Sequence, residues 1–76
     1  LELRRTARVA GADLARLTER QAVIDRRLAD PAAWADGGEG ARLAQERAMV
    51  AQAVARAEDR WLAAHAEVEA AEMALD

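Results

Sequence analysis

The sequence predicts an all-α fold, an antiparallel two-helix coiled-coil hairpin with a short connecting turn that contains proline and glycine. Two long segments place apolar residues at alternating steps of three and four, which is the spacing of a coiled-coil seam. The single proline and three of the four glycines lie between these segments, where both helices must end. The composition agrees, because 53% of the residues are hydrophobic but many are alanine, and Phe and Tyr are absent.

The first helix is expected over residues about 2–29. The seam positions of this segment are Leu3, Ala7, Ala10, Leu14, Leu17, Gln21, Ile24 and Leu28. Seven of these eight residues are apolar, and their mean spacing of 3.5 residues predicts a left-handed coiled coil. Strict alternation of apolar and polar residues, which would indicate a strand, is not found.

The tip is expected over residues 30–40. Proline is tolerated in the first turn of a helix but not inside one, so Asp30-Pro31 ends the first helix near Ala29. Asp30 is a candidate N-cap for a short turn that runs to Trp34. The glycines of the tip are Gly37, Gly38 and Gly40. A connection of this length favours antiparallel packing of the two helices.

The second helix is expected over residues about 41–75. Its seam positions are Leu43, Arg47, Val50, Val54, Ala57, Trp61, Ala64, Val68, Ala71 and Leu75. Only Arg47 is polar, and folding back places it near Gln21, where a polar pair helps to fix the alignment at some cost in stability. Residues 1–76 thus form one hairpin domain, which we expect to be a piece of a longer protein.

The sizes of the seam residues favour one register. If Leu28 lies opposite Leu43, the largest side chain, Trp61, falls opposite Ala10 and beside Gly11. The bulky ring then meets open space.

The same register predicts two ion pairs between the positions that flank the seam. These pairs are Arg27 with Glu46 and Asp13 with Arg60. Each contributes only about 0–1 kcal/mol, but together they oppose a slipped alignment.

The arginines provide the one candidate binding surface. All eleven basic residues are arginine, and residues 1–28 carry seven of them against four acids, a net +3 in a chain of net charge −3. Four arginines are expected to project away from the seam and to follow a phosphate backbone: Arg5, Arg8, Arg16 and Arg26. The alternative is a solvated face that pairs with acids such as Asp13, Glu19 and Asp25. No aromatic residue is interleaved with the arginines, so base stacking is not indicated.

The remaining features give no catalytic site. The run Gly37-Gly38-Glu39-Gly40 follows no strand and is interpreted as a flexible link rather than a phosphate cradle. His65 has no second ligand at matching spacing and lies beside the seam, with Arg4 as a candidate neighbour. Trp34 has two interpretations, a recognition residue at the tip or a lid over Leu28 and Leu43. We expect no enzymatic activity and no cofactor or metal in this chain.

The same composition bears on location. No run of about 18 apolar residues is present, so no membrane span is expected. No signal peptide is expected, because arginines interrupt the N-terminal segment. The absence of Cys fits a reducing compartment, and a cytoplasmic location is expected.

Three segments, in this order and spacing, carry a family resemblance that covers nearly the whole chain. They are LARLTE at residues 14–19, LADP at residues 28–31 with Trp34 following, and AEDRWL at residues 57–62. With them the chain resembles the C-terminal coiled-coil domain of ABC-F ATPases, the Uup-type soluble ATP-binding cassette proteins. It departs from the family in having no Lys and an acidic total charge, and in lacking most of the basic upstream linker.

The resemblance implies a function. The parent protein would carry two ATPase cassettes upstream, with ATP and Mg bound there and not in this hairpin. The family acts on ribosomes, and the tail is associated with binding of nucleic acid. We therefore expect a non-catalytic accessory domain that assists contact with DNA, RNA or the ribosome. The alternative is a structural spacer or dimerisation hairpin without nucleic-acid contact, in which a second copy is the partner.

Overall fold

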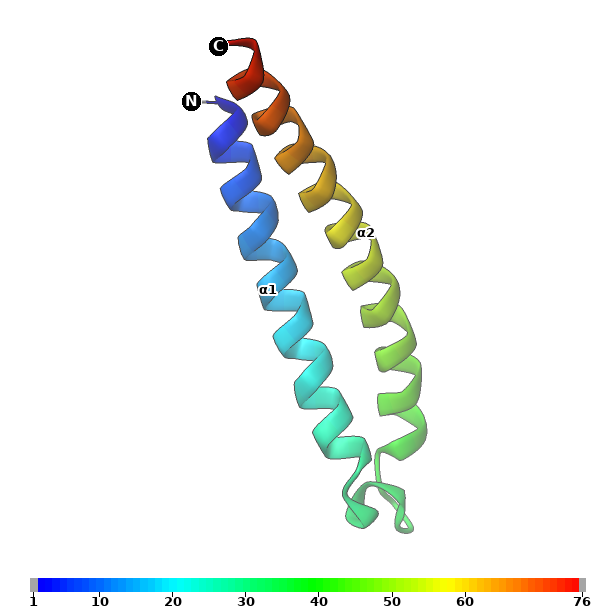
Figure 1. Ribbon diagram of the computed structural model, residues 1–76. Helices are drawn as coiled ribbons and strands as arrows, with labels where there is room; N and C mark the ends of the chain where they lie inside the picture. The colour runs from blue at the N-terminus through cyan, green and yellow to red at the C-terminus, as the bar shows by residue number, and fades with distance from the viewer. Residues whose placement is uncertain (1, 76) are drawn as a thin grey trace.

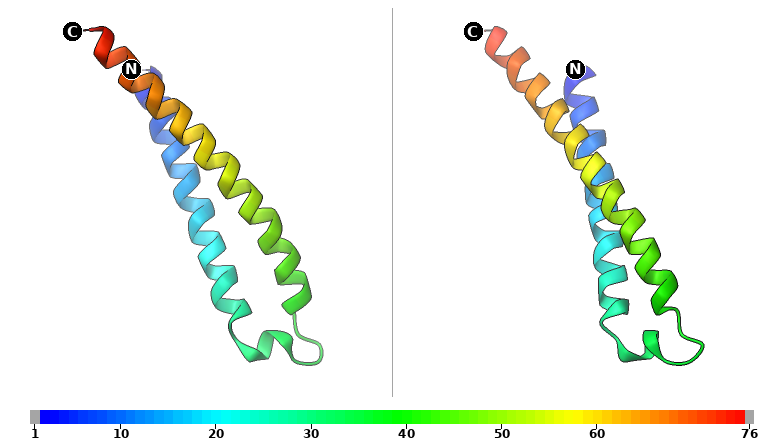
Figure 2. Two further views of the ribbon diagram at one scale, coloured as in Figure 1. Left: turned by 45° about the vertical axis from the view of Figure 1, so that its right-hand side comes forward. Right: turned by 90° about the vertical axis from the view of Figure 1, so that its right-hand side faces the viewer.

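The computed structural model describes residues 2–75. Two long helices, α1 (Glu2–Leu28) and α2 (Gly40–Ala74), run antiparallel and are joined through a short 3-10 helix, η1 (Pro31–Trp34). The molecule is a rod with principal extents of 62 × 15 × 14 Å. Figure 1 shows the two termini together at one end of the rod and the tip at the other, and Figure 2 shows the helices crossing at a shallow angle. The predicted antiparallel helical hairpin is confirmed.

The helices end within one residue of the expected limits. At the end of α1, the amide of Ala29 still donates to Asp25 at 3.1 Å, whereas the amide of Asp30 donates to Arg27 at 3.2 Å, one residue closer in sequence. This tightening of the last turn is a common way to end a helix. At the start of α2, the amide of Leu43 donates to the carbonyl of Glu39 at 2.8 Å, so the helix begins at Gly40.

The predicted seam is the core. Ile24, Leu43, Ala57 and Ala64 are buried, and all four are predicted seam residues. The other seam positions from residue 7 to residue 71 are half-buried, and only the end positions Leu3 and Leu75 are exposed. Removal of this apolar stripe from water drives the pairing of the helices, because neither helix can bury it alone.

The predicted register is also confirmed. A Cβ built on Gly11 would lie 3.2 Å from Nε1 and 3.3 Å from Cδ1 of Trp61, so the indole occupies the space that Gly11 leaves. Toward the termini, Leu3 and Val68 line the same hollow, as the register requires.

The two predicted ion pairs are wrong in their partners. Arg27 bonds to Glu39 rather than to Glu46, and Glu46 bonds to Arg20. Each observed partner lies seven residues from the predicted one, so the same flanking faces meet, one heptad displaced. An arginine side chain spans more than a helical turn, and exposed pairs gain too little energy for sequence spacing to select among partners.

The second predicted pair is absent as well. Asp13 lies 3.7 Å from Arg16 on its own helix, one turn away, and no carboxylate of residues 2–75 lies within ion-pair distance of Arg60. The polar seam residue Arg47 bonds to Asp25, one turn from Gln21.

The tip is held by its own polar groups. Asp30 caps η1 as predicted, with Oδ1 accepting from the amide of Ala32 at 3.0 Å. The indole Nε1 of Trp34 donates to the carbonyl of Leu28 at 2.9 Å, which satisfies one of the free carbonyls at the end of α1. The same ring lies on Gly40, where a Cβ would come within 2.5 Å of Cε3. Trp34 therefore ties the last turn of α1 to the first turn of α2.

Candidate nucleic-acid interface

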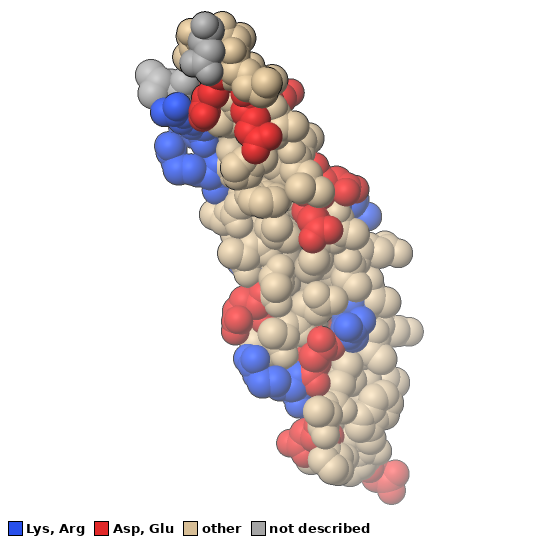
Figure 3. Space-filling view, viewed as in Figure 1, with Lys and Arg blue, Asp and Glu red and all other residues tan. Residues whose placement is uncertain are grey.

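The four predicted arginines lie on the outer side of α1, and all four are exposed. Arg5 and Arg8 belong to the first two turns, Arg16 lies in the middle and Arg26 in the last turn. In the view of Figure 3, basic side chains cover the N-terminal turns of α1 and carboxylates cover the adjacent end of α2. Arg5 and Arg8 are one turn apart on the helix, whereas Arg16 and Arg26 lie eight and eighteen residues beyond Arg8.

Two of the four arginines are paired with acids of their own helix. Arg16 lies 3.7 Å from Asp13, and Arg26 lies 3.6 Å from Glu19. Glu19 sits between them on the outer side of α1, so the arginine face is interrupted by a carboxylate. These exposed pairs are worth only about 0–1 kcal/mol each, but they offset the local positive charge.

Arg5 and Arg8 are different. No carboxylate of residues 2–75 lies within ion-pair distance of either guanidinium, whereas the neighbouring Arg4 contacts Glu72 at 3.4 Å. Spaced three residues apart, Arg5 and Arg8 are neighbours on the helix surface. Like charges at this spacing repel each other, and Arg4, four residues before Arg8, adds a third positive charge to the same turns. An anion bound here would be stabilised by both guanidinium groups.

The arginines near the tip form ion pairs with acids of the hairpin itself. Arg42 and Arg27 both bond to Glu39, and the hydrogen bond from Arg42 holds the pKa of that carboxyl below its usual value. The hydrogen bond to Asp25 likewise raises the pKa of the Arg47 guanidinium. These pairs connect the helices and leave little free positive charge at the tip.

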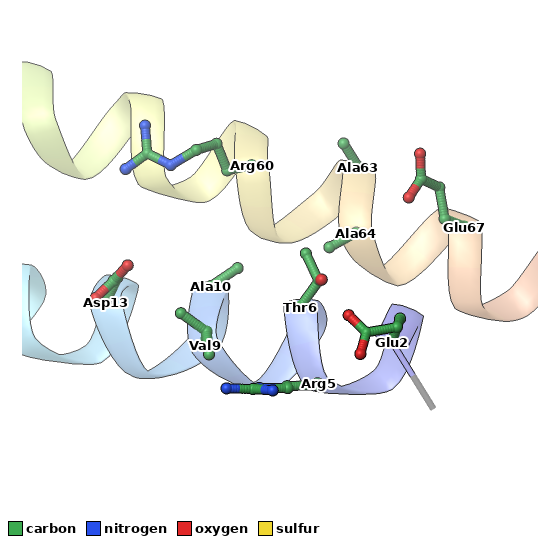
Figure 4. Close-up of a pocket in the computed structure, with 10 residues that line it drawn as sticks. All are labelled: Glu2, Arg5, Thr6, Val9, Ala10, Asp13, Arg60, Ala63, Ala64 and Glu67. Carbon is green, nitrogen blue, oxygen red and sulfur yellow. The ribbon is translucent and has the colours of Figure 1, made fainter.

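Sequence reasoning missed one element of the surface, a groove between the helices near the termini. Thr6, Val9 and Ala10 of α1 and Ala63 and Ala64 of α2 line it, and its volume is about 490 Å³ (Figure 4). The signal was present in the sequence, because small side chains occupy facing positions on both helices and leave the space unfilled. Arg5 lies on its rim.

The described residues offer no metal site. No group of three His, Asp or Glu side chains within residues 2–75 is placed to hold a metal ion. His65 packs edge-on against Trp61, with ring centroids 4.8 Å apart and planes at 72°, and its expected neighbour Arg4 is directed to Glu72 instead. Neither helix, over its described length, has a stretch apolar enough to cross a bilayer.

Comparisons of this chain with protein-family models, with curated protein sequences and with solved structures find no match.

Proposed function

We propose that this hairpin is a non-catalytic accessory domain that contacts the phosphates of a nucleic acid, free or within a ribosome, through the N-terminal turns of α1. The observation that carries the proposal is the pair Arg5 and Arg8, exposed side by side without a carboxylate partner in residues 2–75. Every other arginine of α1 has a carboxylate within 4 Å. Neighbouring cations of like charge lower the stability of a helix, and an anion that binds to both relieves their repulsion.

The proposal includes the parent protein that the family resemblance implies. The chain would be the C-terminal domain of a cytoplasmic ABC-F ATPase whose ATP and Mg sites lie in cassettes outside this hairpin. Its task would be to add phosphate contacts to those of the cassettes. The reading frame upstream of this segment tests this part directly, because a frame without two ATP-binding cassettes would contradict the assignment.

Phosphate contact is tested by fluorescence anisotropy of labelled single-stranded RNA, single-stranded DNA and duplex DNA across a salt series. Affinity should fall steeply as salt rises, with a slope in log–log form of about 0.7–0.9 per phosphate contacted. Arg5→Ala/Arg8→Ala should weaken binding to all three probes. Because two phosphate contacts are lost, the slope should fall by about 1.4–1.8.

The matched control is Arg16→Ala/Arg26→Ala, which removes the same charge from the same helix. Since both of these arginines are paired with carboxylates, we expect a smaller loss of affinity. Equal losses for the two double variants would show that net charge, and not the Arg5–Arg8 pair, governs binding.

The second candidate is a structural hairpin that acts as a spacer or a dimerisation element. It is favoured by the continuous seam along a rod 62 Å long and by the pairing of Arg16 and Arg26 with acids. The absence of binding to every probe at low salt would favour this candidate over the first.

A further inference from the structure

The open-end groove, defined by Thr6, Val9, Ala10, Ala63 and Ala64, is apolar along its floor and charged along its rim. Val9, a large apolar side chain, is 55% exposed beside it. Figure 4 shows Arg60 and Asp13 at one end of the groove and Glu67 and Glu2 at the other. Among residues 2–75, neither Arg60 nor Glu67 has an ion-pair partner. An apolar floor with unpaired charges on its rim is typical of a surface that binds a partner.

The face of α1 beside this groove is complementary to itself. Glu2, Arg5, Val9, Asp13 and Arg16 follow one another at steps of three or four residues and share one side of the helix. If a second α1 is laid antiparallel with Val9 against Val9, the order of charges is reversed. Arg5 then meets Asp13 of the other copy, and Glu2 meets Arg16, so that every facing pair of charges is opposite in sign.

The face of α2 beside the groove behaves in the same way. Arg60 and Glu67 are two turns apart, about 10 Å along the axis, with Ala63 and Ala64 between them. If a second α2 is laid antiparallel with the two alanine pairs in contact, Arg60 of each copy meets Glu67 of the other. The small alanines allow the two helices to approach closely at the centre.

One symmetry axis serves both faces. In the observed register Trp61 lies against Gly11 and Leu3 lies near Val68, so Val9 falls opposite residues 62–63, within two residues of the Ala63–Ala64 pair. A two-fold axis through that point therefore pairs α1 with α1 and α2 with α2 at once. The charge patterns of the two helices are therefore symmetric about points at nearly the same level, Val9 on α1 and Ala63–Ala64 on α2.

We propose that a second copy of this chain docks on the open-end groove, with the two hairpins antiparallel about a two-fold axis at Val9 and Ala63–Ala64. The half of the rod near the termini then becomes a four-helix bundle, whose interior holds the groove residues of both copies. Such an interface is isologous, since each residue pair occurs twice. Arg8 lies outside the contacting face of α1 and stays accessible to phosphate in the dimer. Arg5 is held by Asp13 of the other copy there, so the dimer offers one arginine of the pair and the monomer offers both.

The test is the oligomeric state of the 76-residue chain by sedimentation equilibrium, with charge reversals at the α2 pair. Arg60→Glu and Glu67→Arg should each weaken the dimer at least tenfold, because each places like charges opposite one another twice. The double variant Arg60→Glu/Glu67→Arg restores opposite charges and should recover the dimer. Glu69→Arg, a reversal on α2 away from the groove, is the control and should leave the dimer intact.

A second pair of variants keeps the proposal testable if a reversal on α2 disturbs folding. Arg5→Asp and Asp13→Arg should each weaken the dimer and together restore it, with far-UV circular dichroism showing helical hairpins throughout. Val9→Asp should give a folded monomer. A wild-type chain that stays monomeric at all concentrations, or single reversals that leave the dimer unchanged, would overturn the proposal.

Discussion

The indole of Trp61 fills the space above Gly11, with Nε1 only 3.2 Å from where a Cβ at that glycine would lie. A glycine inside a helix costs about 1 kcal/mol relative to alanine, so its place in the middle of α1 requires a reason. The reason is the ring packed across the seam. This contact fixes the alignment of the helices, because no other position of α1 beside the seam offers the same space.

Enlarging Gly11 should test this contact through stability. Gly11→Ala should change the free energy of unfolding by less than about 1 kcal/mol, since better helix propensity offsets a tight contact with the ring. Gly11→Leu should cost about 1–3 kcal/mol through overpacking. Chemical denaturation measures both values. In a Trp61→Ala background the cost of Gly11→Leu should shrink, and an unchanged cost would show that the ring is not the obstacle.

The seam and its register followed from the sequence because they depend on size and spacing. Leu28 can face Leu43 and Trp61 can face Gly11 in only one alignment of two rigid helices. The partners of the flanking charges did not follow, since Arg27 reaches Glu39 as readily as Glu46 and the energies involved are small. Of the candidate arginines, sequence placed all four on the outer side, but only the structure shows which are paired.

The contact between Trp34 and Gly40 was also beyond the sequence, because it depends on the path of the tip. Gly40→Ala should destabilise the hairpin by about 1–3 kcal/mol, since the new Cβ would lie 2.5 Å from the ring and 2.9 Å from the carbonyl oxygen of Ala33. Trp34→Phe should cost about 0.5–1.5 kcal/mol by removing the hydrogen bond to Leu28. Thermal unfolding followed by circular dichroism reports both. A neutral Gly40→Ala would contradict the packing of the ring on this glycine.

Stability should fall in acid, and Glu39 should account for part of that fall. Its pKa is lowered, first by the hydrogen bond from Arg42 and also by the charge of Arg27. The unfolded chain therefore binds a proton more readily than the folded one, and the contribution of Glu39 is complete above its usual pKa of 4.5 and is lost as pH falls through the lower folded value. Melting temperatures measured from neutral pH into acid should decrease less for Glu39→Gln than for the wild type. Parallel curves would contradict this role.

The polar seam residue Arg47 should limit stability. It faces the level of the buried Ile24, and its bond to Asp25 joins two side chains that are 44% and 46% exposed. Arg47→Leu should raise the free energy of unfolding by about 1 kcal/mol, since a buried leucine gains more than a half-exposed pair loses. Arg56→Leu, at an exposed position, is the control and should not stabilise the chain. Denaturant unfolding measures both proteins. A wild type more stable than Arg47→Leu would show that the ion pair with Asp25 contributes more to stability than burial of the leucine does.

Stability and nucleic-acid contact should oppose each other at the start of α1. Arg8→Glu replaces the repulsion between Arg8 and the arginines three and four residues before it, Arg5 and Arg4, by attraction, so the melting temperature should rise slightly. The same variant should bind RNA and DNA at least tenfold more weakly than the wild type, by anisotropy at low salt. Glu69→Arg shifts the net charge by two in the opposite direction and is the control. It should neither lower the melting temperature nor strengthen binding by a similar factor. A variant that is less stable and binds equally well would contradict both roles of Arg8.

The seam, the arginine surface and the groove all depend on the register of the two helices, and one measurement tests that register directly. In a nuclear Overhauser spectrum of the labelled chain, the indole proton of Trp61 should show cross-peaks to the α-protons of Gly11. The indole proton of Trp34 should show cross-peaks to Leu28, which distinguishes the two tryptophans. Cross-peaks from Trp61 to Arg4 or Thr18, each one heptad from Gly11, would show that the helices pair in a slipped register and would contradict the account.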